Sequence, residues 1–250
     1  MINILGVNIS TLNKSELKDA LADLLESDRQ HYVVTPNPEM LVAAQKDSEF
    51  QDILNGADIA IADGVGLQYA ATSSGQNLPR ITGNDLLKML AALCTDKNKK
   101  IMLLGGEKED VAKKSADLLL EEYPTLQVDH DPAGPVYKLD DEWHMNPAVI
   151  QHIKEFEPAV LLVAFGHGKQ EKWIRAFLSE LPSVKLAAGI GGAFDYLSGS
   201  VPRAPRHLQT MGLEWAYRLY KEPKRLGRIW TAVVVFPFCV IYDKIKSRKQ

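Results

Sequence analysis

Asp63 follows directly after an apolar run, Ile59 to Ala62, in the segment AIADGVG. A short apolar run of this kind predicts a buried strand, and ligands of open α/β sheets bind beyond the carboxyl ends of the strands. A carboxylate is ionised at neutral pH and can take a proton from an attacking hydroxyl. Gly64 and Gly66 would leave room for that hydroxyl to approach. The position also fits a helix N-cap or a turn aspartate, so both interpretations stay open.

Three other polar or glycine-rich segments follow predicted strands: Thr35-Pro36-Asn37, Gly105-Gly106 and Gly166 to Glu171. In the last of these, GHGKQE, glycines precede a helix start. Backbone N–H groups and Gln170 would there point toward a bound anion. Gly105-Gly106 lacks the rest of the GxGxxG pattern, which favours a tight strand-to-helix turn over a phosphate site.

Two further patterns suggest chemistry on weaker grounds. His167 could act in acid–base catalysis, but the sequence assigns it no partner carboxylate. Asp129-His130-Asp131 has the DxD form that holds a divalent metal in many nucleotide-sugar enzymes. It begins a proline-rich stretch, however, and we predict a solvated loop from Asp129 to Asn146. We therefore expect no metal site and no cofactor.

The elements that must position these residues alternate between short β-rich runs and amphipathic helical runs over the first 200 residues. This alternation predicts an α/β fold with a parallel sheet covered by helices. The predicted strands are Tyr32 to Thr35, Ile59 to Ala62, Ile101 to Leu104, Leu126 to Val128, Val160 to Ala164 and Val184 to Ala188. The predicted helices include Pro38 to Asn55, Asn84 to Leu93, Val111 to Tyr123 and Asn146 to Phe156. Asn13 and Glu16 predict a capping box at the start of another helix.

The C-terminal part of the chain differs from the rest in charge. Residues 203–250 hold 11 Lys and Arg against 3 Asp and Glu, whereas residues 1–202 hold 18 against 29. Arg218, Arg225 and Arg228 would share one helix face, which is either solvated or suited to binding phosphates. The 14-residue apolar run from Ile229 to Tyr242 is too short to span a bilayer. We expect it to lie in the headgroup layer, or to be covered by the body or by a second copy of the chain.

The composition is that of an ordinary globular protein of 250 residues, with 46% hydrophobic and 24% charged residues. Cys94 and Cys239 suggest neither a disulfide framework nor a zinc site. The first residues lack the pattern of a secretory signal. We expect a protein of the cytoplasm whose basic tail meets a membrane surface or phosphate, with no nucleic-acid partner.

The motifs together resemble the WecG/TagA/CpsF family, glycosyltransferase family 26. The segments that carry the resemblance are TPNPEML at Thr35, ADGVGL at Ala62, RITGNDLL at Arg80, LLGG at Leu103, GHGKQEKWI at Gly166, GIGGAFDYLSG at Gly189 and the arginine-rich stretch from Arg203. They occur in one order from about residue 30 to residue 230. The resemblance implies a Rossmann-like catalytic domain of residues 1–200. It also implies a basic, amphipathic appendage of residues 201–250 that docks peripherally on the inner face of the cell membrane.

The activity that the resemblance implies is transfer of a sugar from a UDP-sugar donor to a sugar on undecaprenyl diphosphate, without a divalent metal. The best-known reaction of the family moves N-acetylmannosamine from UDP-N-acetylmannosamine to the C4 hydroxyl of N-acetylglucosaminyl-diphosphoundecaprenol. It inverts the anomeric carbon and belongs to synthesis of the wall teichoic acid linkage unit.

The resemblance also implies roles for individual residues. Asp63 matches a catalytic base, and its matching pocket neighbours are Thr35, Asn37, Arg80 and Gln170. The segments similar to the UDP-sugar half of the site contain Gln170, Glu171, Gly191, Gly192 and Asp195. The arginines that match those contacting the diphosphate are Arg218, Arg225 and Arg228. The chain departs from the family at Gly168, where proline is usual, and in the Asp129 to Asp141 stretch.

Two other classes of protein stay open from the residues themselves. One is a nucleotide-dependent oxidoreductase or sugar epimerase on a similar sheet, although the missing GxGxxG argues against the oxidoreductase. The other is a peripheral membrane adaptor that keeps a nucleotide-binding fold without catalysis.

Overall fold

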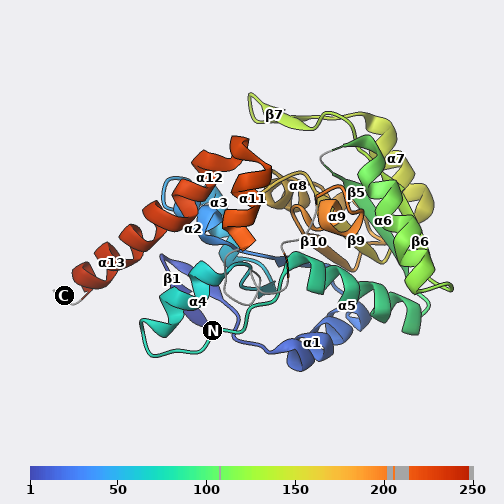
Figure 1. The fold of residues 1–250 in the computed structure, drawn as a ribbon. Coiled ribbons are helices and arrows are strands. Elements are labelled where there is room, and N and C mark those ends of the chain that lie inside the picture. Colours follow the sequence, from blue (N-terminus) through green and yellow to red (C-terminus); the bar gives the residue numbers. More distant parts are fainter. Residues whose placement is uncertain (107, 202–204, 206–213, 248–250) are drawn as a thin grey trace.

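Six parallel strands form the central sheet of the computed structural model, which describes residues 1–106, 108–201, 205 and 214–247 (Figure 1). In spatial order the strands are β4 (Ile59–Ala60), β3 (His31–Val34), β10 (Leu186–Gly189), β9 (Val160–Ala164), β5 (Lys100–Gly105) and β6 (Gln127–Asp131). Every neighbouring pair is parallel, which confirms the predicted sheet. Because β9 and β10 return between β3 and β5, the strand order reverses inside the sheet, which is where ligands of such folds bind.

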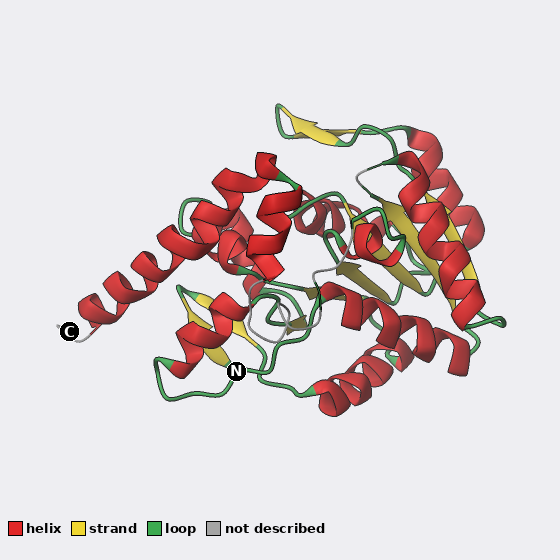
Figure 2. Ribbon diagram, viewed as in Figure 1, coloured by secondary structure: helices red, strands yellow, loops and turns green. Residues whose placement is uncertain are grey.

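Helices cover both faces of this sheet (Figure 2). One face packs against α1 (Lys14–Glu26), α5 (Gly83–Asp96) and α6 (Glu109–Glu122), and the other against α2 (Pro38–Ala44), α3 (Ser48–Asn55), α7 (Pro147–Phe156) and α8 (Lys169–Phe177). Successive strand residues face opposite sides. Leu103 therefore joins the buried cluster of the first face, and Leu104 joins that of the second.

Local capping fixes the start of the helices that lie near the strand ends. Asn13 accepts the Glu16 N–H and Glu16 accepts the Asn13 N–H, so the predicted capping box of α1 is confirmed. Thr82 and Asp85 form the same box at α5. That box brings Gly83 against the loop after β10, where an added Cβ would lie 2.7 Å from the Ile190 carbonyl oxygen.

Two predicted segments differ from the structure. The single helix predicted from Pro38 to Asn55 is two helices, because Asp47 caps a new helix, α3, by accepting the Phe50 N–H at 2.9 Å. The predicted solvated loop from Asp129 to Asn146 is also wrong at its start. Asp129 to Asp131 belong to the edge strand β6, and a hairpin of β7 (Tyr137–Leu139) and β8 (Glu142–His144) follows. A further hairpin, β1 (Ile2–Ile4) and β2 (Val7–Ile9), begins the chain.

The C-terminal helix, as we call residues Pro223–Lys246, is longer than the apolar run predicted. It joins a short turn at Pro223–Arg225, α12 (Leu226–Trp230), a π-helical turn (Thr231–Val235) and all but the last residue of α13 (Phe236–Ser247). Proline cannot donate a backbone hydrogen bond to the preceding helical turn, and its ring clashes with that turn. The π-helical turn is wider than an α-helical one and lets the helix continue through Pro237. The resulting 24 residues are long and apolar enough to cross a membrane by length and composition. The argument that this segment is too short to span is therefore wrong.

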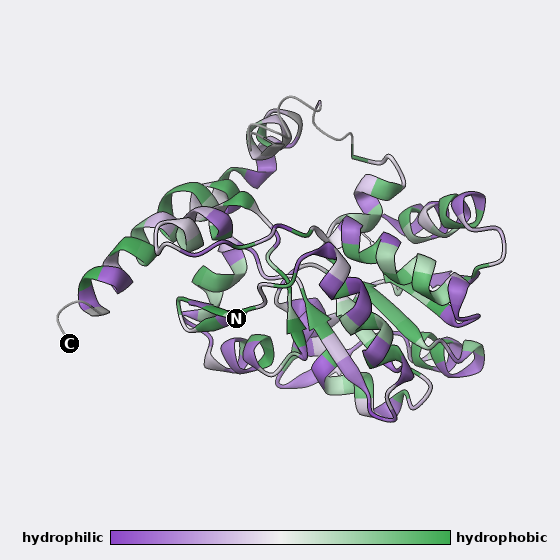
Figure 3. Cartoon of the chain, turned by 90° about the horizontal axis from the view of Figure 1, so that it is seen from below, coloured by the Kyte–Doolittle hydropathy of each residue, from purple (hydrophilic) through white to green (hydrophobic). Residues whose placement is uncertain are grey.

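This helix nevertheless packs on the body along part of its length. Phe236 is 1% exposed and joins the buried cluster of α2 and α4 (Val65–Thr72). Beyond that contact the helix projects away from the sheet, with apolar residues along it and polar ones toward its end (Figure 3). It is preceded by α11 (Glu214–Lys221). Arg203 and Arg206 of the predicted arginine-rich region lie outside the described residues.

Candidate active site

A cavity of about 770 Å³ lies at the carboxyl ends of the central strands. Its lining includes residues that follow five strands, namely Thr35, Asp63, Gly106, Phe165 and Ile190. Further walls come from helices α2, α4, α5 and α8, the short helix α9 (Ala193–Leu197), α11 and the C-terminal helix. The cavity thus brings together segments that lie far apart in the sequence, among them the candidate segments that follow predicted strands.

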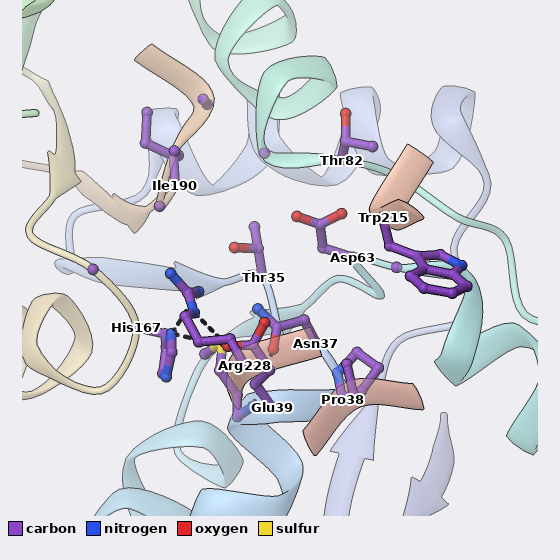
Figure 4. A pocket seen from close by; sticks show the side chains of 18 of the residues that line it. Thr35, Asn37, Pro38, Glu39, Asp63, Thr82, His167, Ile190, Trp215 and Arg228 are labelled. Carbon is purple, nitrogen blue, oxygen red and sulfur yellow. Dashed lines mark hydrogen bonds and ion pairs between the residues drawn. The ribbon is translucent and has the colours of Figure 1, made fainter. Parts of the chain in front are cut away.

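Asp63 lies in this cavity, three residues beyond the end of β4 (Figure 4). Its backbone N–H donates to the Pro36 carbonyl at 2.8 Å, which ties it to the end of β3. The N-cap of α4 is Gly64 rather than Asp63, so the N-cap interpretation of this aspartate is wrong. Gly64 has a φ of +110°, which favours glycine, and Gly66 leaves space for the Pro38 and Phe236 rings. The two glycines thus serve the turn and the packing around Asp63.

A chain of hydrogen bonds joins β3, β10 and α8 under the cavity. The buried Thr35 hydroxyl donates to the Gly189 carbonyl at 2.9 Å, and the Gly191 N–H donates to Gln170 Oε1 at 3.1 Å. An added Cβ on Gly189 would lie 2.7 Å from Gln170 Nε2. Gln170 therefore holds the glycine-rich turn after β10 in place, and Thr35, Gln170 and Gly191 all line the cavity.

Glu171 lies behind that wall rather than in it. Its side chain is fully buried and accepts hydrogen bonds from Gln170 Nε2 and from the Gly168 N–H, both at 2.7 Å. Burial raises the pKa of Glu171 to about 7, although these hydrogen bonds oppose the rise. Gly168, the N-cap of α8, has a φ of +79° that proline cannot adopt. The residue at which the chain departs from the family, Gly168, thus lies in a turn that is held by the hydrogen bond from its N–H to Glu171.

Most of the other predicted site residues line the same cavity. These are Asn37, Arg80, Gly192, Asp195, Arg225 and Arg228. Asn37 caps α2 by accepting the Met40 N–H at 3.0 Å, so its amide nitrogen is the atom suited to a ligand. Arg218 lies in α11, but its side chain is outside the described part of the structure.

Arg228 reaches the cavity from the C-terminal helix and binds two residues of the body. Its Nε donates to Glu39 Oε2 at 2.7 Å, and one of its terminal nitrogens lies 3.1 Å from His167 Nδ1 (Figure 4). Burial, followed by the positive charge of Arg228, lowers the pKa of His167. The imidazole is therefore neutral near pH 7 and accepts from the guanidinium.

The sequence reasoning missed two of the residues at this site. Glu39 stands within the quoted TPNPEML segment, but its partner is 189 residues away. Trp215 of α11 lines the cavity on the side of Asp63. Only its place in the arginine-rich segment could have drawn attention to it. His167, which was considered for acid–base chemistry, lies 3.1 Å from a nitrogen of Arg228 and 3.9 Å from Glu39 Oε2.

Asp129 and Asp131 lie on β6 and both bind His152. The His152 ring nitrogens are each 2.9 Å from one carboxylate. The pKa of His152 is raised, chiefly by its hydrogen bond with Asp131 and further by that with Asp129. Across residues 1–106, 108–201, 205 and 214–247, no cluster of three or more His, Cys, Asp or Glu is arranged to hold a metal ion.

The structure is an α/β fold with a cavity across the carboxyl ends of its parallel strands, the arrangement of many α/β enzymes. The glycosyl transferase WecG/TagA/CpsF family model matches residues 2–250, and the chain belongs to this family of glycosyltransferases. A Bacillus subtilis relative is 33% identical over 198 residues, which cover 79% of this chain and 74% of the relative. A Staphylococcus aureus relative is 28% identical over 251 residues, 99% of this chain and 95% of the relative. Both relatives are named N-acetylglucosaminyldiphosphoundecaprenol N-acetyl-beta-D-mannosaminyltransferase.

Proposed function

We propose that this glycosyltransferase moves N-acetylmannosamine from UDP-N-acetylmannosamine to the C4 hydroxyl of N-acetylglucosaminyl-diphosphoundecaprenol, with inversion, in synthesis of the teichoic acid linkage unit. The observation that carries the proposal is a carboxylate, Asp63, in one cavity with Arg225 and Arg228 of the C-terminal helix. A base and cationic groups in one cavity are what an attack by a hydroxyl on a diphosphate sugar requires. The names of the relatives support this choice of transferred sugar and acceptor.

The reaction is a single displacement. The C4 oxygen of the acceptor attacks C1 of the donor sugar from the face opposite UDP, and Asp63 takes the hydroxyl proton. As the new C–O bond forms, the bond between C1 and the diphosphate breaks, and its electron pair leaves with UDP. Attack and departure on opposite faces invert C1. Alignment of the two substrates in one cavity supplies a large part of the rate.

The charge that develops on UDP needs compensation. Arg80, Arg218, Arg225 and Arg228 are our candidates for this role, because guanidinium groups bind diphosphate oxygens with two hydrogen bonds. On the donor side we assign sugar and nucleotide contacts to Gln170, Gly191, Gly192 and Asp195. Glu171 binds Gln170 and Gly168. We therefore assign it the role of holding these two residues in place, with no direct contact to the donor.

We divide the chain into a catalytic body of residues 1–200 and an appendage of residues 201–250 that docks on the cytoplasmic face of the membrane. The exposed apolar residues of the C-terminal helix support this, among them Trp230, Phe238 and Tyr242. Peripheral docking fits a helix whose Phe236 and Val240 are buried against the body.

Replacement of Asp63 by Asn tests the proposal, because it keeps the shape and removes the base. UDP release would be measured by mass spectrometry with UDP-N-acetylmannosamine, other UDP-sugars and a short-chain lipid-diphosphate acceptor. We expect UDP-N-acetylmannosamine to be used best and D63N to lower kcat at least about 100-fold. Asp23→Asn, on the exposed side of α1, is the matched control. Near-normal UDP release by D63N would refute the role of Asp63, and use of another donor would refute the assigned sugar.

A further inference from the structure

The cavity changes character along the C-terminal helix. The residues of this helix that line it are Arg225, Arg228, Ile229, Ala232, Val233, Phe236, Pro237, Val240 and Ile241. Their spacing of three and four places them on one helix face. Two arginines begin this face, and the rest of it is apolar. Arg228 and Ile241 are 13 residues apart, or about 20 Å along a helix.

Helix α4 supplies the opposite wall of the apolar part. Its lining residues also fall on one face and are Val65, Gly66, Tyr69 and Ala70, with Ser73 just beyond the helix. The floor is buried, with Phe236 at 1% exposure, Ala70 at 7% and Val240 at 9%. Val233, Tyr69 and Ile241 stand at the rim and are at least 41% exposed. We call this channel between α4 and the C-terminal helix the apolar groove.

A glycine lets the floor of the groove pack closely against α4. Gly66 lies under Phe236, and a Cβ added there would be 3.6 Å from that ring and 2.7 Å from Pro38 Cγ. At the far end Lys244 Nζ donates to the Ser73 hydroxyl and links the two walls. The groove is thus bounded by two packed helices and is continuous with the part of the cavity that contains Asp63.

The order of chemistry along the cavity matches one kind of ligand. Asp63 and the strand-end turns are polar, Arg225 and Arg228 are cationic, and the groove is apolar. An amphiphile that carries a sugar, then a diphosphate, then a hydrocarbon chain has the same three parts in the same order. Burial of apolar surface away from water is favourable by about 25 cal/mol per Å². A hydrocarbon chain that fills the groove would remove both its own apolar surface and that of the groove from water.

We propose that the apolar groove binds the isoprenoid units nearest the diphosphate of the lipid-linked acceptor. The inference rests on the proposed function for the identity of the acceptor. The groove then selects prenyl diphosphates over short alkyl diphosphates even when no membrane is present. It also sets the direction in which the acceptor enters, with its sugar toward Asp63 and its chain leaving along α13.

Two soluble acceptors test this without vesicles or detergent micelles: N-acetylglucosaminyl diphosphate esterified with a methyl group or with a farnesyl chain. We expect the wild-type KM to be at least about tenfold lower for the farnesyl acceptor. Ile241→Ser and Tyr69→Ser, both at the rim, should reduce that preference several-fold, because they should raise the KM for the farnesyl acceptor more than the KM for the methyl acceptor. Phe238→Ser is the matched control, because Phe238 is on the same helix and 70% exposed but outside the cavity lining.

Binding of farnesyl diphosphate and methyl diphosphate, measured by calorimetry on the same four proteins, separates this inference from the proposed function. Preferential binding of farnesyl diphosphate that I241S and Y69S weaken supports the groove even if no sugar transfer is found. Equal binding of the two diphosphates, or equal effects of I241S and F238S, would overturn the groove even if transfer proceeds normally.

Discussion

Arg228 and Glu39 form an ion pair of 2.7 Å that joins the C-terminal helix to the first turn of α2. The Glu39 carboxylate lies where the α2 dipole favours negative charge, and its side chain is 18% exposed. The α2 dipole thus stabilises the Glu39 carboxylate, and Glu39 in turn holds the guanidinium of Arg228 at the cavity. Because His167 accepts from the same guanidinium, the C-terminal helix is fastened at the cavity by two contacts.

We predict that Glu39 positions Arg228 for the acceptor diphosphate. Glu39→Gln removes the charge that orients the guanidinium, and we expect the KM for the lipid-linked acceptor to rise about three- to tenfold with a smaller change in kcat. Glu39→Asp should restore part of the loss. Asp117→Asn breaks an exposed pair with Lys113 and serves as the control, since such pairs contribute little. An unchanged KM in E39Q would contradict the prediction.

Part of this site could be predicted from the sequence because the signals are local. The apolar run before Asp63 predicts a strand, and the glycines after other apolar runs mark where those strands end. These signals indicate which residues lie at the strand ends. The parallel sheet then brings those ends together. The capping box of Asn13 and Glu16 spans four residues and needs no tertiary information.

The remaining features depend on contacts between distant segments. The pairing of Glu39 with Arg228 and that of His152 with Asp129 and Asp131 follow from how helices dock on the sheet. A short polar pattern such as Asp129 to Asp131 looks like a loop in the sequence. Its partner, His152 of α7, is known only from the structure. The length of the C-terminal helix was underestimated because only the 14 apolar residues from Ile229 to Tyr242 were counted, whereas the helix continues into the flanking polar residues and passes Pro237 by a π-helical turn.

Glu171 is expected to make stability depend on pH. Its pKa is raised from the ordinary 4.5 to about 7 by burial, so folding disfavours the ionised form. The stability that the protonated form provides is present below pH 4.5 and is lost as the pH rises through about 7. Urea unfolding between pH 5 and pH 8 should show a loss of up to about 3 kcal/mol from this group.

Glu171→Gln is the comparison, because glutamine does not titrate. We expect the difference in unfolding free energy between wild type and E171Q to change with pH in that range. The cost of placing an amide beside Gln170 does not depend on pH, so it shifts the whole curve and does not change its shape. Parallel pH curves for the two proteins would show that Glu171 does not titrate in this range.

Gly83 is expected to tolerate no side chain. An alanine Cβ would lie 2.7 Å from the Ile190 carbonyl oxygen, and neither backbone can move without shifting α5 or the turn after β10. We predict that G83A lowers the free energy of unfolding by about 1–3 kcal/mol. Gly227, in α12, has open space around its Cβ position, so G227A should be neutral or stabilising by about 0.5–1 kcal/mol. Equal stability of the two variants in thermal or urea unfolding would contradict the packing argument.

Membrane docking by the C-terminal helix has a separate signature. Phe238 is 70% exposed and Tyr242 is 65% exposed, and basic residues such as Lys224 and Lys246 lie toward the two ends of the helix. Apolar side chains flanked by basic ones suit the interface of a membrane that contains anionic lipids. We predict that the protein sediments with anionic vesicles, and that F238S with Y242S weakens this binding at least about tenfold.

Salt and extraction distinguish docking on the surface from crossing the bilayer. Because electrostatic attraction contributes to docking, binding should fall as salt rises, and an alkaline carbonate wash should release the protein. Retention after the wash would show instead that the 24-residue helix inserts across the bilayer, which its length allows. Insertion would require Phe236 and Val240 to leave the body, so it would also expose the floor of the apolar groove. The packing of these two residues is the reason we expect release.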